Sequence, residues 1–358
     1  MKKKERLKIA FLDSWFLDQS RGSGTTVAIR GLSEALISIG CSVDIISPSL
    51  KNRSHLLRRL FYNFFLRFRI KEEKYDAIIG CDIDGCFFHP KKKNNFYVLL
   101  NGIAAEEAKY ESGFSRFVLW FLSILEKKNV SKAKKVFVPS LHSQNIAMKC
   151  YKLSEEKLSV IPIGISVSLW DEIFTKKVNR KVSPPYILSV ARQYPRKNTS
   201  FLISAMKDVV KHIPNAKLFV IGGGPMEEIL REQVFKLQLS ENIEILGEIS
   251  NNQDVIKAYE EASLFCLPSL QEGFGIVFLE AMCAGLPIVA VNISAVPEVL
   301  GDSALLVEEN DLQGLADSIV RILKDDDFHR TLQLKGRKRV ENFDWSVVAK
   351  RFLESLVV

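Results

Sequence analysis

Short apolar runs alternate along the chain with longer segments in which apolar residues recur every three or four positions. Residues 8–12, KIAFL, form a run of the first kind, and residues 25–40 form a segment of the second kind. Short apolar runs between polar turns predict buried strands, and the helical spacing predicts amphipathic helices. Strands that alternate with helices in this way predict parallel α/β sheets. In the second segment the helical spacing is set by Val27, Ile29, Leu32, Leu36 and Ile39.

The clearest such unit is residues 264–291. An apolar run at 264–267 ends at Pro268, and a polar turn follows at 269–275. A helical segment then runs from Ile276 until Gly285 and Pro287 stop it, and a second apolar run occupies 288–291. This order predicts a strand, a loop, a helix and a strand, which is the βαβ unit of a parallel sheet.

The loop of this unit has the chemistry of an anion site. Gly273 and Gly275 let the backbone approach a ligand closely, and the free N–H groups at a helix start point toward phosphate oxygens. Glu272 stands in the loop and Glu280 lies one turn past Ile276 on the same helix face. Two carboxylates beside a phosphate site predict a ligand that carries both phosphate and hydroxyl groups.

The string from Glu272 to Ala290, EGFGIVFLEAMCAGLPIVA, resembles the Glu-x7-Glu motif of retaining GT-B glycosyltransferases of family 4. The resemblance implies that Glu272 contacts the donor sugar and that Glu280 binds the nucleotide ribose. It also implies an α/β GT-B fold, in which two doubly wound Rossmann-like domains face each other across a cleft. The donor-binding residues that it implies between the two glutamates are Gly273, Phe274, Gly275, Ile276 and Val277.

Two cations five residues apart resemble a second motif of that family, in which arginine and lysine hold the donor diphosphate. They are Arg192 and Lys197, in the segment SVARQYPRK, and Arg196 is a rival for the arginine position. Cations at a strand end lie where α/β sheets bind ligands. Their task is to neutralise charge on the departing nucleoside diphosphate. The resemblance further places the backbone near Ile249 beside the base.

The N-terminal half resembles the family less closely. A glycine pair near the donor phosphates corresponds to the loop RGSGTT, where Gly24 and Leu32 keep the family spacing and Ser23 replaces one glycine. In the family a histidine often precedes a glycine near the acceptor, and this chain has Asn101 there. Asparagine cannot act as a general base. Asp82 and Asp84 form a DxD pattern that could hold Mg²⁺ or Mn²⁺ or simply end a strand, and we expect no metal and no cofactor.

Charge is distributed unevenly over the 358 residues, whose net charge is +8. Residues 1–170 hold 28 Lys+Arg and 16 Asp+Glu, a net charge of +12, so this half should face something anionic. In 55–70, HLLRRLFYNFFLRFRI, aromatic residues fall on one helical face and arginines on the other. This describes either an interfacial membrane helix or a helix packed on the sheet with a basic solvent face. The apolar helix predicted at 116–128 is expected to be core.

Other features limit the class of protein. The six cysteines are scattered without a CxxC pair, which predicts reduced thiols. The basic N-terminus lacks a signal-peptide pattern, and no apolar stretch is long enough to span a membrane. These features predict a cytoplasmic protein, peripheral at the inner face of the membrane if 55–70 binds lipid.

The expected function is transfer of a sugar from a nucleoside-diphosphate sugar to a glycan or lipid-linked acceptor, without metal and with retention of configuration. No nucleic-acid partner is expected, and peripheral contact with an anionic membrane follows if 55–70 is an interfacial helix. Two alternatives are a non-catalytic GT-B partner subunit and a sugar phosphorylase or epimerase of related architecture. The expected domains are 1–170 on the acceptor side, 171–345 for the nucleotide sugar, and a helix at 346–358 that crosses back to the first domain.

Overall fold

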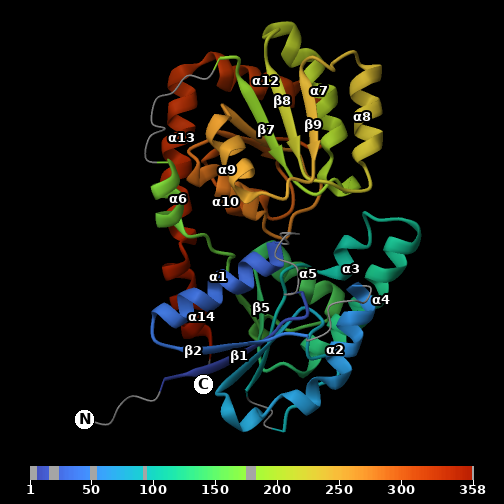
Figure 1. Cartoon of the computed structure of the whole chain (residues 1–358), viewed down its shortest axis with the longest axis vertical. Coiled ribbons are helices and arrows are strands. Elements are labelled where there is room, and N and C mark those ends of the chain that lie inside the picture. Colours follow the sequence, from blue (N-terminus) through green and yellow to red (C-terminus); the bar gives the residue numbers. More distant parts are fainter. Residues whose placement is uncertain (1–5, 16–23, 49–54, 92–94, 175–182, 357–358) are drawn as a thin grey trace. The chain divides into compact units, whose positions relative to one another are not determined.

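A computed structural model describes residues 6–15, 24–48, 55–91, 95–174 and 183–356. The chain divides into two compact units, shown in Figure 1. The N-terminal unit comprises residues 1–164 together with 345–358, and the C-terminal unit comprises residues 165–344. Residues 345–358 therefore pack with the N-terminal unit, although they follow the C-terminal unit in sequence. Residues 175–182, which precede Tyr186, lie outside the described residues.

The N-terminal unit is built on a parallel six-stranded sheet in the order β2-β1-β3-β4-β5-β6. Its strands are β1 (Lys8–Leu12), β2 (Ser42–Ile46), β3 (Ala77–Cys81), β4 (Phe96–Leu99), β5 (Val136–Val138) and β6 (Leu158–Val160). Its α-helices are α1 (Gly24–Ser38), α2 (His55–Arg69), α3 (Ala104–Glu107), α4 (Gly113–Lys132), α5 (Leu141–Tyr151) and α14 (Trp345–Ser355).

The C-terminal unit has a second parallel six-stranded sheet, in the order β12-β11-β10-β7-β8-β9. Its strands are β7 (Tyr186–Val190), β8 (Lys217–Ile221), β9 (Ile243–Gly247), β10 (Leu264–Leu267), β11 (Ile288–Val291) and β12 (Ala304–Val307). Its α-helices are α6 (Val167–Phe174), α7 (Thr199–His212), α8 (Glu227–Lys236), α9 (Asn252–Glu261), α10 (Ile276–Cys283), α11 (Val296–Leu300), α12 (Leu312–Lys324) and α13 (Asp326–Val340).

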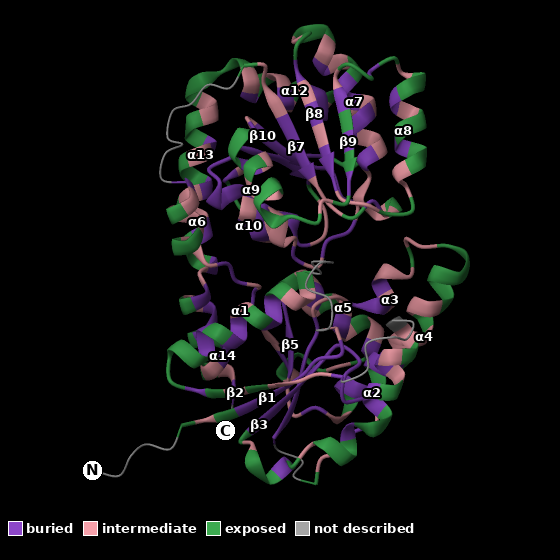
Figure 2. Ribbon diagram, in the orientation of Figure 1, coloured by how far each residue is buried: buried purple, intermediate pink, exposed green. Residues whose placement is uncertain are grey.

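Each sheet is covered on both faces, as buried parallel sheets must be. In β1, Ile9 and Phe11 join one core with α1 and α14, while Ala10 and Leu12 join a second core on the other face with α2, α4 and α5. Figure 2 shows the resulting buried strands between more exposed helices. The prediction of two doubly wound α/β units is confirmed.

The last helix, α14, is fixed to the N-terminal unit by a large aromatic side chain. Trp345 is buried and lies directly against Gly31 of α1 and Gly164, where any side-chain carbon would collide with the indole ring. Val348 and Phe352 continue the same contact into the core beside β1. The amphipathic pattern of the last residues therefore serves packing within this unit.

Two helices of the N-terminal unit differ from expectation. The segment at 116–128, expected to be core, lies in α4, where Phe117, Trp120 and Ile124 are exposed; that expectation is wrong. In α2, Arg59 and Asn63 are buried, whereas Arg67 and Arg69 are exposed and Phe64 is 55% exposed. The alternative of a helix packed on the sheet with a basic solvent face therefore holds for Arg67 and Arg69 but is wrong for Arg59. Arg59 faces inward, where the Ser14 hydroxyl accepts a hydrogen bond from its Nε atom at 2.9 Å. Among the described residues no helix is long and apolar enough to cross a membrane.

Candidate functional site

The core of the candidate site is an ion pair between the loops that follow two neighbouring strands of the C-terminal unit. The Lys197 Nζ atom lies 2.5 Å from the Glu272 Oε1 atom, and their side chains are 14% and 7% exposed. The Ser269 hydroxyl also donates to Oε1, at 2.9 Å. Two donors on one carboxylate oxygen hold Glu272 in a single orientation, and they leave its second oxygen available to a ligand.

The strand order explains why these residues meet. β7 pairs with β10 in parallel register, so the loops after both strands leave the same edge of the sheet. The first loop contains a 3₁₀ turn at Pro195–Lys197, and the backbone N–H of Leu270 donates to the Arg196 carbonyl at 2.7 Å. This bond ties the cation-bearing loop directly to the loop that carries Glu272.

A glycine turn after β8 supports the cation-bearing loop from the other side. Gly222 has a φ of +116°, and a Cβ atom there would lie 2.0 Å from the Ala191 carbonyl oxygen. A Cβ atom at Gly224 would lie 2.6 Å from the Gln193 carbonyl oxygen, and the Gln193 N–H donates to the Gly223 carbonyl at 3.0 Å. The GGGP segment thus has a structural task, because only glycine lets the two loops approach this closely.

The two arginines of the loop have different surroundings. Arg192 is about half exposed and lies 3.9 Å from Glu248, next to Ile249. Ile249 itself lines a hollow of about 260 Å³ beneath α9. Arg196 places its guanidinium over the Tyr194 ring at 5.1 Å, and its buried Nε atom has no hydrogen-bond partner among the described residues. Neither guanidinium is held as tightly as the Lys197 ammonium.

The start of α10 presents backbone donors beside the ion pair. Gly275 precedes the helix with a φ of +86°, a conformation that favours glycine, and no side chain caps the first turn. The N–H groups at Ile276 and Val277 thus stand at the positive end of the helix dipole. The ring of Phe274 is buried against Phe343, so only its backbone faces the loop surface.

Glu280 lies one turn further along α10, where it accepts a hydrogen bond from the buried Tyr259 hydroxyl at 2.8 Å. Burial raises the pKa of the Glu280 carboxyl to about 7, although the bond from Tyr259 opposes the rise. The ring of Tyr259 packs edge-on against Trp170 at 5.7 Å. Glu280 is therefore a carboxyl group that titrates near neutral pH.

The C-terminal unit brings together most of the predicted site residues. Lys197, Glu272 and the start of α10 form one cluster, with Arg196 joined through its backbone and Glu280 one turn away. Gly24 begins α1 in the N-terminal unit. The preceding Gly22 and Ser23 lie outside the described residues.

Two side chains in this cluster are not in the predicted set. Ser269 stands three residues before Glu272, and so short a spacing could have indicated from sequence that the hydroxyl contacts this carboxylate. Tyr259 is 21 residues from Glu280 on another helix, and no local pattern connects them.

The DxD pattern lies at the end of β3 in the N-terminal unit. Asp84 accepts hydrogen bonds from the Ser14 backbone and hydroxyl and from the Asn63 amide, at 2.7 to 2.8 Å. Asp82 accepts a bond from the Asn101 backbone at 2.9 Å. Within the described residues, no group of three or more His, Cys, Asp or Glu side chains is arranged to hold a metal ion. Asp84 has a structural role in joining β1, α2 and β3.

Comparison with known proteins finds a family match in the C-terminal unit. Residues 171–339 match the family model of glycosyl transferases group 1. The phosphatidyl-myo-inositol mannosyltransferase of Mycolicibacterium smegmatis is 34% identical over 162 residues, which are 44% of this chain and 41% of that protein. The Staphylococcus aureus capsular polysaccharide biosynthesis glycosyltransferase CapM is 27% identical over 72% of this chain and 68% of its own length. The chain thus aligns with less than half the length of the mannosyltransferase.

The whole chain also has a counterpart among solved structures. Sucrose-phosphate synthase from Thermosynechococcus elongatus superposes with a TM-score of 0.76, covers 98% of both chains and is 20% identical. This likeness establishes the fold alone, and it confirms the expected GT-B fold. The family match falls on the unit that carries Lys197, Glu272 and Glu280. Residues 171–339, which carry the candidate site, thus match the family of glycosyl transferases group 1.

Proposed function

We propose that the protein transfers a sugar from a nucleoside-diphosphate sugar to a glycan or lipid-linked acceptor, with retention of configuration and without a metal ion. The observation that carries the proposal is the Lys197–Glu272 pair at the uncapped start of α10. An ammonium group and helix N–H groups suit a diphosphate, and an anchored carboxylate suits sugar hydroxyls. The names of the mannosyltransferase and of CapM support the choice of acceptor class.

The chemistry follows from where charge develops. When the bond between the sugar C1 and the phosphate oxygen breaks, its electron pair stays on the nucleoside diphosphate. Lys197 and the N–H groups of Ile276 and Val277 would stabilise that charge without a metal, because they are already fixed before reaction, and Arg192 would add a further cation. Glu272 would orient the sugar through its hydroxyl groups, and Glu280 would accept hydrogen bonds from the ribose.

A thermal-shift screen tests the donor half of this proposal. The intact protein is heated with UDP, GDP, ADP and their common sugar conjugates, with and without EDTA. A ligand that binds only the folded state raises the melting temperature, by an amount that reflects its affinity. We expect one nucleotide series to give a shift that EDTA does not remove. A shift lost with EDTA would contradict metal independence, and no shift with any nucleotide would favour a non-catalytic partner subunit.

Glu280 gives the site a testable pH dependence. Its pKa of about 7 means that the carboxylate, which accepts hydrogen bonds more strongly than the acid form, appears as pH rises through 7. We expect affinity for the selected nucleotide sugar to rise about tenfold between acidic and mildly alkaline pH, since a charged hydrogen bond contributes roughly 1.5–3 kcal/mol. Calorimetric titration across this range measures it.

The matched control for this measurement is Glu280→Gln. The variant keeps the shape of the side chain but cannot ionise, so its affinity should stay near the low-pH value of the wild type throughout. A variant that retains the wild-type pH profile would show that another group titrates. A nucleotide sugar is the right probe because its esterified diphosphate does not titrate near neutral pH, whereas the terminal phosphate of a free nucleotide does.

A further inference from the structure

The exposed aromatic side chains of this protein are concentrated on two helices of the N-terminal unit. Eight phenylalanine and tryptophan side chains are exposed among the described residues, and seven lie on α2 and α4. The eighth is Phe235 in the C-terminal unit. Phe68 is 70% exposed and Phe114 is 78% exposed, which is costly for side chains of this size without a partner. The seven are Phe61, Phe64, Phe65, Phe68, Phe114, Phe117 and Trp120.

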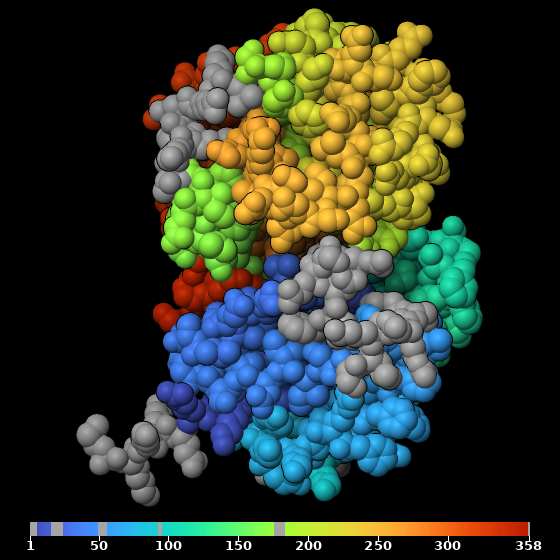
Figure 3. Space-filling view, viewed as in Figure 1, coloured from blue at the N-terminus to red at the C-terminus, as the bar shows by residue number. Residues whose placement is uncertain are grey.

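The two helices are neighbours. Leu60 of α2 and Leu125 of α4 pack in one small apolar cluster around Ile83. Figure 3 shows both helices at the surface on the same side of the N-terminal unit. The exposed residues follow helical spacing in each case, so each helix presents a stripe and not scattered positions. We call these two stripes and the cations around them the α2–α4 surface.

The charge of the α2–α4 surface is of one sign. α2 contains no acidic residue, and the single acidic residue of α4, Glu126, is buried. The guanidinium of Arg67 lies over the Phe68 ring at 4.5 Å, so cation and aromatic ring are presented together. The exposed cations on the two helices are Arg67, Arg69, Arg116, Lys127 and Lys128.

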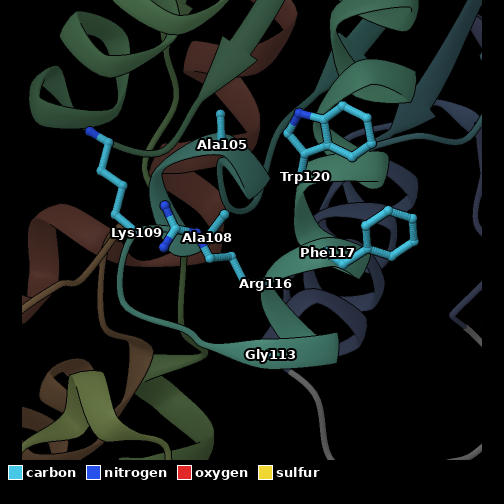
Figure 4. Close-up of a pocket in the computed structure, with 7 residues that line it drawn as sticks. All are labelled: Ala105, Ala108, Lys109, Gly113, Arg116, Phe117 and Trp120. Atoms are coloured by element: carbon cyan, nitrogen blue, oxygen red, sulfur yellow. The ribbon is translucent and has the colours of Figure 1, made fainter.

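A hollow at one end of this surface also places a cation beside exposed aromatic rings. It has a volume of about 420 Å³ and lies between α3 and the first turns of α4. Arg116 lies between Lys109 and the rings of Phe117 and Trp120, as Figure 4 shows. Lys109 is paired with Glu106, whereas Arg116 has no ion-pair partner among the described residues. A cation beside exposed aromatic rings suits an anionic headgroup whose chains lie against those rings.

We infer that the α2–α4 surface docks on the anionic face of a lipid bilayer. Aromatic rings on a helix lying in the interface enter the boundary between headgroups and acyl chains. Each lysine or arginine near an anionic leaflet adds to the attraction between the protein and the membrane. A second copy of this chain fits poorly, because a symmetric contact would bring the same five cations together from each copy. The inference does not depend on sugar transfer.

Sedimentation with vesicles tests the inference on the intact protein without donor or acceptor. We expect binding to phosphatidylcholine vesicles that contain phosphatidylglycerol, and at least tenfold weaker binding to pure phosphatidylcholine. The double variant Phe117→Ser/Trp120→Ser should lose about tenfold or more in affinity for the anionic vesicles, because two rings no longer leave water. Phe235→Ser, at an even more exposed aromatic residue of the other unit, is the control and should bind as the wild type does.

Charge and fluorescence give independent readouts. Arg116→Gln/Lys127→Gln keeps the aromatic residues and should weaken binding to anionic vesicles while leaving the melting temperature unchanged. Trp120 is 54% exposed and the other described tryptophans are less so, hence its emission should shift to the blue on anionic vesicles. Trp120→Phe should keep the binding and lose most of that shift.

Several results would overturn the inference. These are no binding to either vesicle, equal binding of all the variants, or equal binding to neutral and anionic vesicles. A wild-type dimer that dissociates on Phe117→Ser/Trp120→Ser would show that the surface joins two copies. Because no nucleotide is needed, failure here would leave the proposed sugar transfer standing. Failure of the donor screen would likewise leave the membrane result standing.

Discussion

Glu272→Ala and Lys197→Ala are each expected to abolish sugar transfer, with a loss in kcat of at least about 10²- to 10³-fold, the usual effect of removing one group that stabilises developing charge. The two variants should fail in different ways. Lys197 is placed to hold the diphosphate, so its loss should also weaken binding of the free nucleotide. Glu272 is placed to orient the sugar, so its loss should leave free-nucleotide binding nearly unchanged. Steady-state rates with calorimetric nucleotide titrations separate the two effects.

The buried position of the pair makes a stability control necessary. Removing one partner leaves the other charge poorly compensated, so each single variant should have a lower melting temperature. In Lys197→Ala the Ser269 hydroxyl still donates to Glu272, which limits that loss. Lys236→Ala, which breaks an exposed pair with Glu232 on α8, should keep full activity and stability. Full activity in Glu272→Ala, or an equal defect in Lys236→Ala, would contradict the site assignment.

Sequence patterns located the central βαβ unit closely. The runs at 264–267 and 288–291 became β10 and β11, and the helix begins at Ile276 as expected. Proline and glycine mark both ends of these elements, and buried strands in a parallel sheet are apolar throughout. For such short buried elements, local composition alone fixes the type of secondary structure and where it begins and ends.

The pairing of Lys197 with Glu272 could not be read from local sequence. The two residues are 75 positions apart, and they meet because β10 lies beside β7 in the sheet. Strand order is a property of the whole unit, decided by how helices cover both faces. The family resemblance pointed to both residues as donor contacts, but the contact between them is a feature of the fold.

The orientation of α2 shows a second limit. Helical spacing identified the aromatic face, but it cannot say which face is buried, and it grouped the buried Arg59 with the exposed Arg67 and Arg69. The choice was made by polar groups from distant parts of the chain, since Asp84 accepts a hydrogen bond from the Asn63 amide and the Ser14 hydroxyl accepts one from Arg59. A buried polar group needs hydrogen-bond partners. Ser14 and Asp84 provide them for Arg59 and Asn63, so this face of α2 is buried and the aromatic face is exposed.

Arg59 is expected to be among the most sensitive positions for stability of the N-terminal unit. Its side chain is 3% exposed, its Nε atom donates to the Ser14 hydroxyl at 2.9 Å, and its guanidinium stacks on the Trp15 ring at 4.5 Å. Arg59→Leu should destabilise the unit by about 3–5 kcal/mol at mildly alkaline pH, the usual cost of stranding buried charge. Denaturant unfolding measures the loss.

The carboxyl groups around Arg59 make this loss depend on pH. Burial, reinforced by Asp84, raises the pKa of Asp13 to about 7. Burial raises the pKa of Asp82 to about 6, against the opposing charge of Arg59. A carboxyl whose pKa is higher in the folded chain than in the unfolded chain does not lower the free energy of unfolding at strongly acidic pH. It lowers that free energy progressively as pH rises from about 4 to its folded pKa, and by a constant amount above that.

Without Arg59, these carboxyl groups should keep their protons to still higher pH. The loss in free energy of unfolding caused by Arg59→Leu should therefore be smaller at pH 5, where they are protonated, than at pH 8, where they must ionise without a nearby cation. Asp13→Asn should act in the opposite direction: it removes a cost of roughly 4 kcal/mol at pH 8, at about 1.4 kcal/mol per pKa unit. Arg67→Leu, one exposed arginine further along α2, is the matched control and should change stability by less than about 0.5 kcal/mol. A defect of Arg59→Leu that is equal at both pH values would show that Arg59 acts by packing on Trp15, and not by balancing the buried carboxylates.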